Sequence, residues 1–190
     1  MDLLLIRHGR PERIDFDADG ANPALTELGH RQAKLMADYL SPEHIDAIYV
    51  SPQQRAIDTA APLVEVTGLT PTIVDGIAEF DLGHTSYVPG EEAGPFTDEA
   101  LAQLVAEVTA DEFVGRVRSA FAEIIEAHPG ETVAAVCHGG VISTMLCDVL
   151  ELDELPYFDA KYTSVTRLRV SRDGRRSMVS FNECHWLRDL

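Results

Sequence analysis

The sequence predicts an α/β fold, a three-layer α/β/α sandwich with a mostly parallel sheet and a C-terminal antiparallel hairpin at its edge. Short apolar runs alternate with longer segments of helical periodicity along most of the chain. The apolar run at 132–137 continues into His-Gly-Gly at 138–140 and then a helical segment, which is the strand, glycine turn and helix of doubly wound sheets. Apolar and polar residues alternate over 166–181 around Asp-Gly at 173–174, which indicates the hairpin.

The first part of the chain predicts two strands and a helix. Residues 3–6 are apolar and too few for a helix, so we expect a buried strand there and a second strand over 45–50. Thr26 is expected to cap a helix that runs to about Leu40, because Pro42 follows.

Another helix is expected to start at residues 51–54, where Ser-Pro-Gln-Gln has the features of a capping box. This start places Arg55 in the first turn, where a cation opposes the helix dipole by about 0.3–1 kcal/mol unless an anion lies nearby. A short strand over 72–74 and a helix over 111–127 are predicted to follow.

Length and composition predict one domain, residues 1–190, with an insert or lid at 80–110, where glycines, prolines and acidic residues are mixed. The chain has 32 acidic against 15 basic residues, a formal net charge of −17. Nucleic acid and anionic membranes need a basic face, so neither is expected as a partner. An anionic ligand would have to be held by a local cluster of cations.

Cysteine use predicts a reduced, cytoplasmic environment. Cys137, Cys147 and Cys184 are an odd number without a CxxC pair, so we interpret them as packing residues. The apolar start is too short for a signal peptide, and no run approaches the ~20 residues of a membrane span. The oligomeric state is left open, with a homodimer as one option.

Basic side chains follow three of the predicted strands. In an open α/β sheet the carboxyl ends of the strands meet at one edge, where helix N-termini offer free N–H groups to anions. Phosphate is the anion that such a cluster favours, because arginine forks pair with its oxygens. The expected phosphate-binding residues are Arg7, Arg55, His138 and Gly139, with Arg10 at the rim of the pocket unless it is simply solvated.

Chemistry in such a pocket needs a nucleophile and an acid. A histidine of such a pocket can be more than a donor, because a neutral imidazole can attack phosphorus and form a phosphohistidine while the arginines stabilise the charge on the phosphoryl oxygens. The leaving alkoxide needs a proton, and Glu79 is the best placed acid, with Asp81 in reserve. His84, in the insert, is interpreted as a loop residue rather than a substrate contact.

Four ordered blocks of sequence resemble the histidine phosphatase superfamily, also called phosphoglycerate-mutase-like. They lie at residues 5–9, 25–33, 51–60 and 138–140. The resemblance implies an α/β sandwich in which one histidine is phosphorylated, two arginines and a second histidine grip the phosphate, and an acid protonates the leaving group. By position, the phosphorylated histidine is His8, the phosphate ligands are Arg7, Arg55 and His138, and the acid is Glu79.

The chain departs from the pattern of this family near the first block. Family members commonly follow the glycine with an acidic or amide residue and a threonine, whereas residues 10–12 are Arg-Pro-Glu, and Ile14 stands where larger members place an asparagine. Residues 162–164, Tyr-Thr-Ser, resemble a stretch that often begins with asparagine. A chain of 190 residues is short for the mutase branch, which favours water as the phosphoryl acceptor.

The sequence therefore predicts a metal-independent phosphatase, a phosphoric monoester hydrolase without a cofactor, that acts on a phosphorylated small molecule rather than a protein. Mutase-like phosphotransfer and a non-catalytic phosphate-binding or regulatory module remain alternatives. A zinc hydrolase is disfavoured, because no HExxH motif is present and the arginines would repel a cation.

Overall fold

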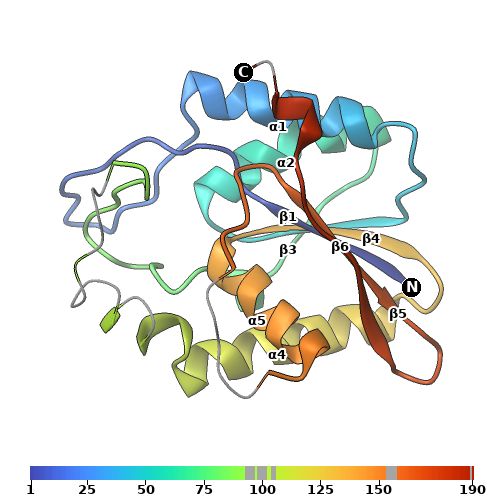
Figure 1. The fold of residues 1–190 in the computed structure, drawn as a ribbon. Coiled ribbons are helices and arrows are strands. Elements are labelled where there is room, and N and C mark those ends of the chain that lie inside the picture. Colours follow the sequence, from blue (N-terminus) through green and yellow to red (C-terminus); the bar gives the residue numbers. More distant parts are fainter. Residues whose placement is uncertain (93–96, 98–101, 104–105, 153–157, 189) are drawn as a thin grey trace.

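Six strands and four longer helices make up the elements that the structure, a computed structural model, describes (Figure 1). The strands are β1 Asp2–Arg7, β2 Ala47–Val50, β3 Thr72–Ile73, β4 Thr132–Cys137, β5 Val165–Val170 and β6 Arg176–Glu183. The helices are α1 Glu27–Leu40, α2 Gln54–Thr67, α4 Asp111–Ala127 and α5 Gly139–Leu150, with short 3-10 turns η1 Asp75–Ile77 and η2 His185–Leu187. The described residues are 1–92, 97, 102–103, 106–152, 158–188 and 190.

The strands form one sheet in the order β3-β2-β4-β1-β5-β6. The pairs β3·β2, β2·β4 and β4·β1 are parallel, whereas β5 is antiparallel to both β1 and β6. Figure 1 shows α1 and α2 over one face of this sheet and α4 and α5 over the other. The predicted fold class, including the antiparallel hairpin at the edge, is confirmed.

The central strand β1 contributes to a separate core on each face, because successive side chains of a strand point to opposite faces. Leu3 and Leu5 are fully buried among residues of α4 and α5. Leu4 and Ile6 are buried among residues of α1 and α2. Because both faces of β1 are covered, its polar residues, Asp2 and Arg7, lie at its two ends. Arg7 is at the carboxyl end.

Helix α1 begins as predicted. The Thr26 hydroxyl accepts a hydrogen bond from the Gly29 amide at 2.9 Å, and it donates one to the Arg10 carbonyl at 3.0 Å. The helix ends at Leu40, and its buried side includes Met36. The cap therefore also attaches the start of α1 to the loop that follows β1.

Replacing Thr26 with alanine is expected to lower the free energy of unfolding by about 1 kcal/mol, because the first turn of α1 loses its cap. Urea denaturation measures the change. Thr70→Ala is the matched control, since Thr70 is exposed in the loop before β3 and should be nearly neutral. Equal losses in the two variants would contradict the capping role.

The predicted capping box at the start of α2 is wrong. The helix begins at Gln54, and its N-cap residue, Gln53, makes no side-chain capping bond. The Ser51 hydroxyl instead lies 2.6 Å from Nε2 of His138, because that buried imidazole nitrogen needs a polar partner. Arg55 nevertheless lies in the first turn, as predicted.

Other element boundaries differ slightly from the sequence prediction. The second and third strands are shorter than predicted, 47–50 and 72–73. Within the proposed insert, residues 102–103 and 106–108 are helical, and residues 93–96, 98–101 and 104–105 lie outside the described part. One domain with an insert or lid at 80–110 stays a prediction. In the described part of the chain, no helix is long and apolar enough to cross a membrane.

Candidate active site

The candidate active site lies where β1 and β4 end. These strands are parallel neighbours with Arg7 opposite Cys137, so the residues that follow them, His8 and His138, come together. The centroids of the two imidazole rings are 5.1 Å apart. Arg55 reaches the same place from the first turn of α2. The structure thus brings together three chain segments that the sequence predicted to converge.

The imidazole of His8 is held in one tautomer. Its side chain is buried, and Nδ1 lies 2.7 Å from the Gly9 carbonyl oxygen. A carbonyl oxygen can only accept, so Nδ1 carries the proton and Nε2 keeps its lone pair. Nε of Arg55 donates to this Nε2 at 3.3 Å.

Burial, and then the charges of Arg55 and Arg7, hold the pKa of His8 well below its ordinary value. The side chain is therefore neutral at neutral pH. A neutral, fixed imidazole whose Nε2 carries no proton has the properties of a nucleophile.

Three buried nitrogens around His8 have no hydrogen-bond partner among the described residues. They are Nε of Arg7, Nη1 of Arg55 and Nδ1 of His138. Buried polar groups in proteins are nearly always paired, so three unpaired nitrogens in one place indicate a ligand site. The two guanidinium groups select an anion.

Two tyrosine rings enclose the arginines of the site. The Arg7 guanidinium carbon lies 4.4 Å from the ring centroid of Tyr162, and that of Arg55 lies 4.7 Å from the ring centroid of Tyr87. Tyr162 also contacts the His8 ring, with 5.7 Å between centroids. These rings shield the cations from water, which strengthens their attraction for an anion.

His138 is oriented from behind by Ser51. The Ser51 hydroxyl lies 2.6 Å from Nε2 of His138 and also accepts a long hydrogen bond, 3.4 Å, from the Gln53 amide. Burial and the charge of Arg55 hold the pKa of His138 well below its ordinary value. In a neutral ring whose Nε2 accepts a hydrogen bond from Ser51, Nδ1 carries the proton and can donate a hydrogen bond to a ligand oxygen.

Glu79 is buried at the N-terminus of α5. Its Oε2 accepts a hydrogen bond from the Gly140 amide at 2.8 Å, and its Oε1 accepts one from the Phe80 amide at 3.2 Å. Burial and then the charge of Asp81 raise the pKa of Glu79 to about 7. Glu79 can therefore hold a proton at neutral pH, as an acid catalyst must.

The glycines of the site allow close approach. A Cβ on Gly140 would lie 2.4 Å from Oε1 of Glu79, and a Cβ on Gly9 would lie 2.7 Å from the Gly29 carbonyl oxygen. The Gly9 amide donates to the Thr59 hydroxyl at 2.9 Å. The four sequence blocks therefore meet physically around His8. Gly139, predicted to bind phosphate, is buried as the first residue of α5.

Arg10 is engaged by acidic residues. Its Nε lies 2.8 Å from a carboxylate oxygen of Glu91, and its Nη2 lies 2.8 Å from one of Glu92. Glu91 also accepts a hydrogen bond from the Tyr162 hydroxyl at 2.9 Å. Arg10 thus ties the segment 87–92 to the site, and its predicted part in substrate binding stays a prediction. His84 is exposed, as expected for a loop residue.

Sequence reasoning did not find four residues around this site. Ser51 was interpreted as a helix cap, Gln53 was assigned no role beyond the helix start, and Tyr162 drew attention only because residues 162–164 resemble a family stretch. Nothing in the pattern pointed to Tyr87, which lies 32 residues from the arginine that it covers. Such contacts between distant segments leave no local signal.

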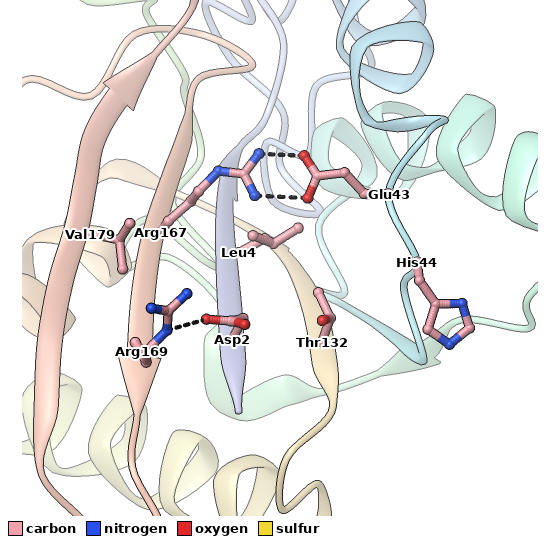
Figure 2. Close-up of a pocket in the computed structure, with 8 residues that line it drawn as sticks. All are labelled: Asp2, Leu4, Glu43, His44, Thr132, Arg167, Arg169 and Val179. Carbon is pink, nitrogen blue, oxygen red and sulfur yellow. Dashed lines mark hydrogen bonds and ion pairs between the residues drawn. The ribbon is translucent and has the colours of Figure 1, made fainter.

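A pocket of about 340 Å³ lies at the opposite end of the parallel strands, where β1 and β4 begin (Figure 2). Its two arginines are already paired: Arg167 with Glu43 and Glu183, and Arg169 with Asp2. The balanced charges of this pocket leave little attraction for an anion. Over the described ranges, no group of three or more His, Cys, Asp or Glu residues is suited to hold a metal ion.

Comparison with known proteins identifies the family of the chain. Residues 3–183 match the model of the histidine phosphatase superfamily (branch 1). Phosphoserine phosphatase 1 of Hydrogenobacter thermophilus is 30% identical over 188 residues, covering 93% of this chain and 89% of that protein.

Two solved structures share the fold. A phosphoserine phosphatase mutant of Entamoeba histolytica in complex with phosphoserine superposes with a TM-score of 0.74, at 25% identity over 98% of both chains. The mycobacterial glucosyl-3-phosphoglycerate phosphatase with VO3 gives a TM-score of 0.78 at 24% identity, over 95% of this chain and 98% of that one. The chain belongs to the histidine phosphatase superfamily (branch 1) and is a phosphoric monoester hydrolase.

Proposed function

We propose that this hydrolase removes the phosphoryl group of a small-molecule monoester through a phosphohistidine at His8, without a metal ion. The observation that carries the proposal is the set of three buried, unpaired nitrogens, from Arg7, Arg55 and His138, beside Nε2 of His8, which carries no proton and accepts a long hydrogen bond from Nε of Arg55. Two arginines and a neutral histidine donor suit the oxygens of a phosphoryl group. They would also repel a metal cation.

In the first step, the long hydrogen bond from Nε of Arg55 to Nε2 of His8 opens, Nε2 attacks phosphorus, and the bond from phosphorus to the ester oxygen breaks. The three unpaired nitrogens donate hydrogen bonds to the phosphoryl oxygens as their charge redistributes. Protonated Glu79 gives its proton to the leaving oxygen, so an alcohol departs and Glu79 becomes a carboxylate.

In the second step, the Glu79 carboxylate takes a proton from water while the water oxygen attacks phosphorus. The bond from phosphorus to Nε2 of His8 breaks, inorganic phosphate leaves, and both groups return to their starting states. A single buried acid with a pKa of about 7 suits both directions of proton transfer near neutral pH.

Water as the acceptor is favoured over phosphotransfer, because the relatives reported above are named as phosphatases. Phosphoserine, the ligand in the complex with the relative from Entamoeba histolytica, is the first substrate that we propose to test. A non-catalytic module would bind phosphate but form no phosphohistidine. The cytoplasmic location, the absence of nucleic-acid and membrane partners, and the oligomeric state stay predictions.

The pH dependence of kcat/KM tests this mechanism. Phosphate release from an alkyl phosphate, measured with EDTA from about pH 5 to 9, is expected to fall as pH rises through about 7. The fall follows because Glu79 must be protonated to donate, and a raised pKa places its deprotonation there. His8, with its lowered pKa, stays neutral at that pH.

An aryl phosphate with a good leaving group is the control, because it needs less help from an acid. Its kcat/KM is expected to fall less than that of the alkyl phosphate as pH rises through about 7. An alkyl phosphate whose kcat/KM stays constant or rises from pH 6 to 9 would contradict the role of Glu79. Activity that EDTA abolishes would contradict the metal-independent route.

A further inference from the structure

The side chain of Asp81 is bound to the phosphate-binding arginine. Nη2 of Arg55 donates to both carboxylate oxygens of Asp81, at 2.8 and 2.9 Å, and Nε2 of Gln53 donates to Oδ1 at 2.7 Å. The pair is shielded, with 1% of the Arg55 side chain and 13% of the Asp81 side chain exposed. Water screens the attraction between these two charges less than it screens a surface ion pair.

This contact fixes the direction of the Arg55 guanidinium. The group is planar, so the bond of Nη2 to Asp81 and the bond of Nε to His8 together determine where Nη1 points. Nη1 is the nitrogen left buried and unpaired. Both oxygens of Asp81 are bound by the Arg55 guanidinium, which directs this carboxylate at the phosphate-binding arginine and leaves it poorly placed as the reserve acid.

We propose that Asp81 is a positioning residue, the resident counter-ion of Arg55, which orients this guanidinium toward His8 and competes with the phosphoryl group for it. The inference rests on the proposed function only in placing the phosphoryl group at Arg55. A negative charge beside the phosphate-binding site weakens the binding of the product, inorganic phosphate, and so favours its release. The Asp81 carboxylate thus orients Arg55 but lowers the affinity of the site for phosphate.

Asp81 also faces the catalytic acid. The charged and titratable groups around Glu79 are Asp81, Arg55, Tyr87 and Cys137. The charge of Asp81 raises the pKa of Glu79, whereas that of Arg55 lowers it. Removing the negative charge of Asp81 leaves the cation unopposed. The pKa of Glu79 should then fall, and the alkaline limb of kcat/KM should move to lower pH.

Asp81→Asn tests the proposal, because asparagine keeps the size and one acceptor oxygen while removing the charge. Inorganic phosphate is expected to bind about tenfold more tightly to this variant by isothermal titration calorimetry. Asp58→Asn is the matched control, since Asp58 lies one turn after Arg55 on α2 and bonds to Leu25 and Gln54 instead. The affinity of the control for phosphate should match that of the wild type.

The pH profile is the second readout, and a merely structural role would not move it. The alkaline limb of Asp81→Asn is expected at lower pH, with the control unchanged. Weaker or unaltered phosphate binding, or an unshifted alkaline limb, would overturn the proposal. Asp81→Ser, smaller and uncharged, gives the same two measurements if the asparagine variant does not fold.

The calorimetric measurement separates this inference from the proposed function. Phosphate binding can be measured whether or not the protein turns over. If the wild type forms no phosphohistidine but Asp81→Asn binds inorganic phosphate more tightly, the result would contradict the mechanism and support the role of Asp81 as counter-ion. If the wild type forms a phosphohistidine but Asp81→Asn gains no affinity for phosphate, the result would contradict only the proposed role of Asp81.

Discussion

Replacing His8 with alanine is expected to lower kcat/KM by about 10³-fold or more, for alkyl and aryl phosphates alike. The loss is large because the variant lacks the nitrogen that attacks phosphorus, and the nearest other imidazole, His138, has its Nε2 occupied by Ser51. Initial rates of phosphate release measure the effect. No leaving group can compensate for a missing nucleophile.

Binding distinguishes the loss of a nucleophile from a collapsed site. Arg7, Arg55 and His138 remain in the variant, so inorganic phosphate or vanadate should still bind. His44→Ala is the control, because its side chain is 87% exposed at the other end of the sheet and should keep wild-type rates. A His8→Ala protein that folds, binds phosphate and keeps a tenth of the activity would refute the nucleophile assignment.

Replacing Glu79 with glutamine is expected to lower kcat/KM by about 10²–10⁴-fold for alkyl phosphates and far less for activated aryl esters. An alkoxide leaves poorly without a proton, whereas an aryl oxide leaves well without one. Glutamine has nearly the same shape and can still accept from the Gly140 amide. Comparing the two substrate classes in one variant therefore isolates proton transfer from damage to the site.

A matched control for this variant is Glu65→Gln, since Glu65 is exposed on α2 and loses one charge without entering the site. Its rates should equal those of the wild type on both substrate classes. If Glu79→Gln slows alkyl and aryl esters by the same factor, Glu79 is not the acid that protonates the leaving group.

The residues at and just after the ends of strands could be predicted, because a parallel sheet brings the carboxyl ends of its strands together. Arg7, His8 and His138 needed only the recognition of two apolar runs, and Arg55 needed the start of a helix. The parallel pairing of β1 with β4 then determines their proximity. Local sequence and general topology were sufficient for this part of the site.

The partners of those residues could not be predicted in the same way. The hydroxyl of Ser51 bonds to a histidine 87 positions later, and the carboxylate of Asp81 bonds to an arginine 26 positions earlier. The Ser51 pair depends on β2 lying beside β4, and the Asp81 pair depends on how the 80–92 segment approaches α2. A serine, a proline and a glutamine beside a helix start also fit a capping box, so the local pattern favoured the wrong interpretation.

The most direct test of the mechanism is the intact mass of the protein after mixing with an activated aryl phosphate and rapid quenching without acid. The mechanism predicts an adduct of about 80 Da, one phosphoryl group, on the wild type. The adduct should be more abundant in Glu79→Gln, where hydrolysis of the phosphohistidine lacks its base, and absent in His8→Ala. Turnover without an adduct in either of the first two proteins, or an adduct that persists in His8→Ala, would contradict a phosphohistidine at His8.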